Sequence, residues 1–184
     1  MADRFQLLQD YWLGMVLPSY CHGRFSRYII TWELCKNMKT DDAKRVVGAA
    51  VKESGIDEVQ RPRLLTDNGS CYISKEFKKF IEYKDLDHVQ GAPYHPQTQG
   101  KIERYHRTMK NVVKLENYFF PDELRTSIES FVNYYNNERY HESLGNLTPA
   151  DVYFGRDRIV KAKRHQIKMK TLKERRKINR KLSA

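Results

Sequence analysis

The sequence is poor in cysteine and has no long apolar run, and both shortages limit the class of protein. Three cysteines occur among 184 residues, Cys21, Cys35 and Cys71, an odd number without metal-ligand spacing. This usage argues against a disulfide framework and predicts a reducing, cytoplasmic setting. No stretch reaches the roughly 18 apolar residues that a membrane-spanning helix needs. The first residues, MADRFQLLQDYW, lack a signal-peptide pattern. We therefore expect one globular domain with appendages and no membrane partner.

Basic residues are unevenly distributed along the chain. Residues 156–184 hold 13 Lys and Arg against two acids, so this tail alone carries the net charge of +11 that the whole chain has. The remaining 155 residues balance to zero. A basic tail suits polyanions, because each phosphate that it neutralises releases counterions. The alternative is a solvated helix that only keeps the protein soluble.

Hydrophobic periodicity predicts an α/β domain, because short apolar runs alternate with amphipathic segments. In the segment 100–115 one face is apolar, and in 91–100 two prolines and two glycines predict a loop. Thr40 and Ser74 are expected to be N-caps, and Gly55 a C-terminal stop. The expected apolar face of 100–115 consists of Ile102, Tyr105, Met109 and Val112. The expected strands are 27–34, 61–67 and 88–90, and the expected helices are 41–53, 74–84, 100–115, 123–137 and the tail after Gly155.

Two acids occupy positions suited to a metal site. Asp67 lies where a predicted strand runs into the turn DNGS, and Glu103 lies in the first turn of a predicted helix, with 35 residues between them. Hard carboxylates that converge from a strand end and a helix start bind Mg²⁺ or Mn²⁺. Taken singly, Asp67 also fits a turn residue that bonds its own backbone, and Glu103 fits an acid favoured by the helix dipole.

Three segments together resemble a known family: RPRLLTDNGSCYIS, APYHPQTQGKIERYHRTMK and NYYNNERYHESLGNLTPADVYFG. They closely resemble bacterial insertion-sequence transposases with a retroviral-integrase-type core. The resemblance implies a ribonuclease-H-like fold, an α/β mixed sheet flanked by helices. It also implies an Asp-Asp-Glu triad that holds two Mg²⁺ or Mn²⁺ ions, with Asp67 as the second Asp and Glu103 as the Glu. The implied regions are a degenerate segment 1–24, a catalytic core 25–155 and a basic helical tail 156–184.

Basic and polar residues near these acids are candidates for DNA contact. Lys and Arg would position phosphates without reading sequence, although each also fits a solvated helix face. The segment NYYNNERYHESL is either a second DNA contact or a packing surface. The predicted partners are DNA and further copies of the chain on DNA, with no small-molecule substrate. The candidate DNA-binding residues are Asn68, His95, Lys101, Arg104, His106, Arg107, Lys110, Lys163, Arg164, Arg175 and Arg176.

The resemblance fails before Phe25. The family carries its first Asp on the first strand and an Asp-Asp before F-S-R-Y, whereas this chain reads CHGR at 21–24. Back-translation with a one-nucleotide shift permits Thr-Asp-Phe from codon 3, Gly-Trp-Gly-Trp-Tyr from codon 12 and Val-Met-Asp-Asp from codon 21. We therefore expect a frameshifted, decayed start with degenerate first strands. Asp3 is the only acid at about the right position for the first ligand, and it would be a by-product of the wrong frame.

The sequence therefore predicts a DNA transposase core that cleaves and joins strands, in a copy that is inactive because its first Asp is missing or displaced. The alternative is a non-catalytic DNA-binding or subunit-poisoning protein derived from such a core. A ribonuclease-H-type nuclease is a third possibility, against which PYHPQTQGKIERYHRTMK argues. The expected location is the bacterial cytoplasm, at the nucleoid.

Overall fold

The computed structural model describes residues 5–9, 17–23, 25–35, 37, 39–55, 63–91, 100–113, 118 and 120–182. For residues 5–9, 17–22, 100–103 and 106 it describes the backbone alone. Asp3, His95 and the loop 92–99 lie outside the described residues, so the predictions that fall on them stay untested.

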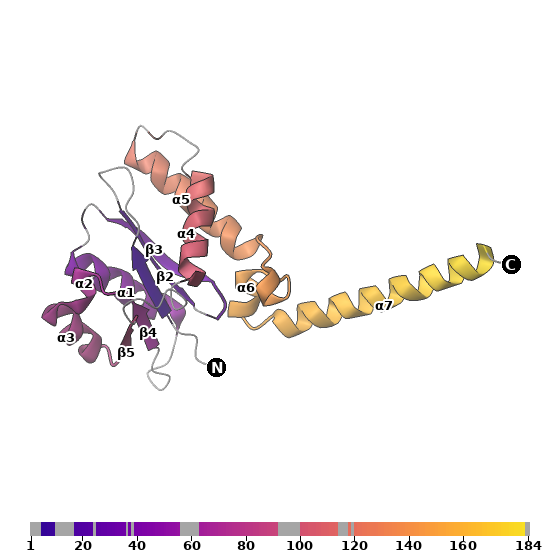
Figure 1. Cartoon of the computed structure of the whole chain (residues 1–184), viewed down its shortest axis with the longest axis horizontal. Helices are drawn as coiled ribbons and strands as arrows, with labels where there is room; N and C mark the ends of the chain where they lie inside the picture. The colour runs from indigo at the N-terminus through magenta and orange to yellow at the C-terminus, as the bar shows by residue number, and fades with distance from the viewer. Residues whose placement is uncertain are drawn as a thin grey trace.

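A five-stranded mixed sheet forms the centre of the molecule, in the order β3-β2-β1-β4-β5 (Figure 1). The first three strands pair antiparallel, and β1, β4 and β5 pair parallel. The strands expected at 27–34, 61–67 and 88–90 are present with boundaries shifted by one to two residues. The strands are β1 Phe5–Gln9, β2 Leu17–Gly23, β3 Ile29–Cys35, β4 Arg63–Thr66 and β5 Asp87–Gln90.

The first two strands are present, although a degenerate sequence was expected there. β1 and β2 pair in a continuous antiparallel register from Phe5↔Gly23 to Gln9↔Ser19. Backbone hydrogen bonds make this ladder whatever the side chains are, and FQLLQ and LPSYCHG contain enough apolar residues to sit in a sheet. This part of the chain thus pairs as strands although its sequence does not resemble the family.

Helices cover both faces of the sheet. Figure 1 shows α1, α2 and α3 on one side and α4 and α5 on the other. Neighbouring residues of β3 point to opposite faces, so Ile30 packs with α1 and α3 whereas Ile29 packs with α4 and α5. The helices are α1 Thr40–Ser54, α2 Ser70–Ile73, α3 Lys75–Tyr83, α4 Gly100–Val113, α5 Pro121–Asn137, α6 Pro149–Tyr153 and α7 Asp157–Leu182, with a 3-10 turn at Glu142–Leu144.

The caps agree with the sequence except at one residue. Ser74 accepts a hydrogen bond from the Phe77 N–H at 3.2 Å, and Gly55 ends α1 with a φ of 58°. The prediction of Thr40 as N-cap is wrong by one position: Lys39 is the cap, and its N–H donates to Asp42 Oδ2 at 3.0 Å. An acid three residues into the helix satisfies the first backbone donor, so Thr40 is released for another contact.

The apolar face of α4 also needs one correction. Tyr105, Met109 and Val113 are buried, whereas Val112 is 50% exposed. Tyr105, Met109 and Val113 follow one another at intervals of four residues and so lie on one face of the helix. Val112 lies about 100° around the helix from Val113 and therefore points away from that face. The Ile102 side chain is outside the described part. The expected tail helix is present as α7, which has no buried residue and projects from the body (Figure 1).

Asn136 ties α5 to the edge strand of the sheet. Its Oδ1 accepts from the Ile29 N–H at 2.9 Å, and its Nδ2 donates to the Ile29 carbonyl at 3.0 Å. The amide thereby replaces the neighbouring strand that β3 lacks on this side. Tyr135 and His141 are buried as well as Asn136. These residues make the segment NYYNNERYHESL, residues 133–144, at least in part a packing surface.

We expect Asn136→Ala to lower the free energy of unfolding by about 2–4 kcal/mol, because it leaves two buried backbone groups of Ile29 without partners. Urea denaturation followed by circular dichroism measures this change. The adjacent Asn137→Ala is the control: its exposed side chain bonds only within α5, to Asn133, and we expect a change below about 0.5 kcal/mol. Equal losses in both variants would contradict the edge-capping role.

Candidate metal and nucleic-acid site

Asp67 lies directly after β4, where the chain leaves the sheet for α2. Its Oδ1 accepts a hydrogen bond from the Gly69 N–H at 2.8 Å, which fixes the carboxylate against the turn. A Cβ on Gly69 would stand 3.0 Å from that same oxygen and 3.4 Å from the Tyr72 ring. The turn therefore needs glycine for close approach, and Asp67 is both a turn residue and a carboxylate at the carboxyl edge of parallel strands, where α/β sheets place ligands.

Polar contacts join the end of β4 to the end of β5 beside Asp67. Asn68 Nδ2 donates to the Gly91 carbonyl at 3.0 Å, and the Gly91 N–H donates to the Thr66 carbonyl at 2.8 Å. The Thr66 hydroxyl donates to the Asp67 carbonyl at 3.0 Å, so it accepts from His88 Nε2 at 2.9 Å. Burial lowers the pKa of His88, which keeps the ring neutral. Asn68 thus holds two strand ends together, and its contact with DNA stays a prediction.

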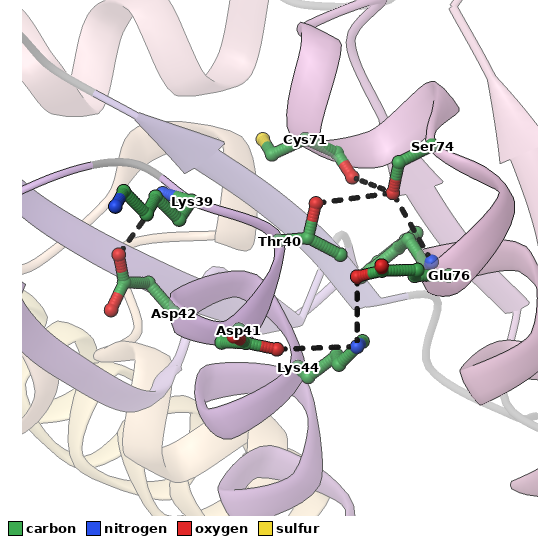
Figure 2. Close-up of polar contacts among 9 residues, drawn as sticks. Lys39, Thr40, Asp41, Asp42, Lys44, Cys71, Ser74 and Glu76 are labelled. Carbon is green, nitrogen blue, oxygen red and sulfur yellow. Dashed lines mark hydrogen bonds and ion pairs between the residues drawn. The ribbon is translucent and has the colours of Figure 1, made fainter.

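A second network fixes the start of α1 against α2 and α3 (Figure 2). The Thr40 hydroxyl donates to Ser74 Oγ at 3.1 Å, and Ser74 Oγ donates to the Cys71 carbonyl at 3.0 Å. Lys44 bridges Asp41 at 3.2 Å and Glu76 at 3.6 Å. Because α2 begins three residues after Asp67, this network anchors the turn from which the carboxylate projects.

The Cys71 thiol lies close to the Asp67 carboxylate. Burial, and then the charge of Asp67, raise the pKa of Cys71. The thiol therefore stays protonated at neutral pH, and Asp67 is the group here that offers anionic oxygen. Hard oxygen is what Mg²⁺ and Mn²⁺ prefer, so the donor chemistry of Asp67 fits the predicted metal.

Glu103 lies in the first turn of α4, whose position is fixed by Tyr105, Met109 and Val113 in the core. Its side chain is not among those described, so the prediction that it shares an ion with Asp67 stays a prediction. Among the side chains that the structure does describe, no three His, Cys, Asp or Glu gather in a metal-binding group. Glu103 and Asp3 stand outside that comparison.

The strand register shows which residues of β1 lie beside the end of β4. Phe5 pairs with Leu64 and Gln6 with Leu65 in parallel strands, so the same register two residues further aligns Leu8 with Asp67. β1 reads FQLLQ and contains no acid. Asp3 lies outside the described residues, so its role as a ligand partner of Asp67 stays a prediction.

The candidate DNA-binding residues lie in two places. On α4, Arg104 and Arg107 are exposed and Lys110 is half-buried, whereas Lys101 and His106 are described by backbone alone. On α7, Lys163, Arg175 and Arg176 are exposed. Arg164 is anchored instead: its guanidinium donates to the Asn146 carbonyl at 2.7 Å and lies 5.5 Å from the Tyr140 ring centre.

Sequence reasoning missed two basic residues that lie near α4. Arg27, in the turn before β3, places Nη1 3.3 Å from His141 Nδ1, and Arg139 lies over the Tyr135 ring. More than 100 residues separate Arg27 from His141. Periodicity and short motifs report local structure, so neither signal could bring these residues together.

Two family models, each described as "Integrase core domain", match the chain, one over residues 22–96 and the other over residues 84–149. The first 21 residues, including Asp3, lie outside both matches. Curated relatives match short stretches. A mouse IgE-binding protein is 53% identical over 51 residues, 27% of this chain and 9% of that protein. A Gag-Pro-Pol polyprotein of squirrel monkey retrovirus is 48% identical over 48 residues, 26% of this chain and 3% of the polyprotein. The chain thus spans less than a tenth of the length of these relatives.

Solved structures match most of the chain. The catalytic core domain of BIV integrase has a TM-score of 0.67 at 17% identity and covers 86% of this chain and 98% of its own. The HTLV-2 integrase catalytic core domain, solved with magnesium in a dimeric form, has a TM-score of 0.65 at 17% identity and covers 83% and 97%. At such identities the similarity shows the fold, and it confirms the expected ribonuclease-H-like class. In the described ranges, no helix has both the length and the apolar character to cross a membrane.

Proposed function

Since the chain carries an integrase-type catalytic core, we propose that its function derives from metal-dependent DNA cleavage and strand transfer. The two integrase-core matches, which together run from residue 22 to 149 on this fold, support the proposal most directly. Asp67 at the carboxyl edge of β4 supplies an oriented carboxylate for that chemistry.

We propose further that the source is a bacterial insertion-sequence transposase. The curated relatives named above come from mouse and from a retrovirus, and they match about a quarter of the chain. The support for a bacterial transposase is the segment PYHPQTQGKIERYHRTMK and the basic tail. On this proposal the protein acts at the bacterial nucleoid.

In an intact site Asp67 and Glu103 would hold Mg²⁺ or Mn²⁺. When bound, two such ions activate the attacking oxygen and stabilise the leaving oxygen. The chain's own residues prepare the site: the Gly69 N–H orients Asp67, and the core side chains of α4 set the helix that bears Glu103. Arg104, Arg107 and Lys110 position DNA phosphates beside the acids.

The chain as written is proposed to be a decayed copy that lacks the first Asp. The absence of an acid in β1 and the start of the family match at residue 22 support this reading. The alternative is a non-catalytic DNA-binding or subunit-poisoning protein. The absence of an acid in β1, the intact sheet and the exposed basic helix α7 favour this alternative. Similar solved structures include a dimeric form of the HTLV-2 integrase catalytic core domain and an intasome of simian T-cell lymphotropic virus, so we propose homo-oligomers on DNA.

The site assignment is tested in a gene whose reading frame over codons 3–24 has been restored. We expect Asp67→Asn and Glu103→Gln to lower Mg²⁺-dependent strand transfer by about a thousandfold or more, as losses of groups that act together do. The matched control is Asp87→Asn: Asp87 pairs with Arg63 at the opposite end of β4 and β5, and the change should be less than about twofold. Similar losses in all three variants would defeat the assignment.

A further inference from the structure

Three arginines from three separate elements converge around Tyr135 and His141. Arg27 is in the turn before β3, Arg104 is in α4 and Arg139 follows α5. Arg27 is held by its hydrogen bond of 3.3 Å to His141 Nδ1. His141 is 8% exposed, and its ring meets the Tyr135 ring edge-on at 5.1 Å. Burial, and then the charges of Arg27 and Arg139, lower the pKa of His141 to about 4, so the neutral imidazole accepts from Arg27.

Arg139 lies over the same aromatic ring, and Arg104 precedes a residue that packs against that ring. The Arg139 guanidinium is 5.9 Å from the Tyr135 ring centre. Arg104 is adjacent in sequence to Tyr105, whose ring meets Tyr135 edge-on at 5.0 Å. Burial lowers the pKa of Arg27, and the charges of Arg104 and Arg139 lower it further, so each of these two guanidinium groups lies close enough to Arg27 to repel it.

Neither Arg27 nor Arg139 forms an ion pair with any Asp or Glu in the described part of the chain. Like charges held close together cost stability, and an anion that binds between them reduces that cost. The planar fork of arginine fits phosphate oxygens with paired hydrogen bonds.

The position of the cluster selects the kind of anion. Arg104 follows Glu103, so the cluster adjoins the first turn of α4. Arg27 and Lys161 of α7 line one cavity of about 330 Å³, together with Asp157, which pairs with Lys161 at 3.4 Å. The cluster therefore lies between the first turn of α4 and the start of the basic helix. A chain of phosphates, as in nucleic acid, can contact several places along this surface, whereas a single small anion occupies only one.

We propose that Arg27, Arg104 and Arg139 form a phosphate-binding cluster for the backbone of duplex DNA, located between the candidate acids and α7. His141 is a positioning residue that holds Arg27. The proposal rests on the proposed function only in taking DNA as the ligand, because binding of a phosphate by these residues needs neither metal nor the first Asp.

The test uses the full chain and a fluorescein-labelled 30-base-pair duplex in EDTA, with binding followed by anisotropy. We expect Arg139→Gln to weaken binding roughly fivefold to tenfold and to flatten the salt dependence by about 0.9 in slope, the loss of one phosphate contact. Arg125→Gln makes the same charge change on α5 itself, about 20 Å further toward the start of that helix, and should leave both quantities unchanged.

Two further variants keep the test decisive. Arg104→Gln changes an exposed side chain and should weaken binding as Arg139→Gln does even if the latter unfolds. Arg139→Lys should restore the salt slope but only part of the affinity, because it keeps the charge and loses the fork. Weaker binding of Arg125→Gln by the same factor, or unchanged binding of both Arg104→Gln and Arg139→Gln, would overturn the cluster. Competition by inorganic phosphate at the same concentration as by duplex phosphate would show an ordinary anion site and would also overturn the DNA assignment. Failure of strand transfer in the frame-restored protein would leave these binding results intact.

Discussion

Truncation after Gly155 is expected to weaken binding of duplex DNA by about a hundredfold or more at 0.1 M salt and to flatten its salt dependence. The removed residues carry 13 Lys and Arg and account for the entire net charge. Each phosphate contact contributes about 0.9 to the slope of log K against log salt, so the loss of five contacts would lower it by about 4.5. Anisotropy titrations between 50 and 200 mM salt measure both quantities.

A second truncation, after Arg164, separates charge from anchoring. It keeps the Arg164 contact with the Asn146 carbonyl and removes eight Lys and Arg with a single acid. Because α7 has no buried residue, both truncated bodies should unfold within about 1 kcal/mol of the full chain. If both truncations bind DNA with the full salt slope, α7 is a solubilising helix and not a DNA-binding element.

Much of the fold follows from local patterns. The strands β3, β4 and β5 and the helices α1, α3, α4, α5 and α7 occur where periodicity places them. Caps such as Ser74 and Gly55 act through neighbouring backbone groups, so a single sequence reveals them. The short helices α2 and α6 were missed, because four or five residues complete little more than one turn and show no period.

Contacts between residues that are far apart in the sequence account for the parts of the fold that local patterns do not predict. Asn136 caps the edge strand at Ile29, 107 residues away, and Arg27 meets His141 across 114 residues. Both asparagine and arginine look like ordinary surface residues in their local sequence. The site divides in the same way: Asp67 could be placed at a strand end from its neighbours, whereas its hydrogen bond to Gly69 and its proximity to Cys71 needed the folded chain.

The largest difference we expect is between the chain as written and a frame-restored version. The chain should show background levels of strand cleavage and strand transfer with Mg²⁺ or Mn²⁺, and restoration of the first Asp should raise the rate by about a thousandfold or more. Two metal ions need ligands that flank both of them, and β1 offers FQLLQ beside the end of β4. On the frameshift reading this start is unselected, and a substitute acid would have to come within about 0.5 Å of productive geometry by chance.

Single substitutions in the unrestored chain complete this test. Asp3→Ala should leave the background rate unchanged, because on the frameshift reading Asp3 is a by-product of the wrong frame. Asp10→Ala, which changes the acid that follows β1 in the sequence, should likewise leave the background rate unchanged. DNA binding in EDTA should be equal in all these proteins, so a rate difference reports the chemical step. If the chain as written cuts DNA as fast as the restored protein and Asp3→Ala abolishes that activity, Asp3 is the true first ligand and the frameshift reading is wrong.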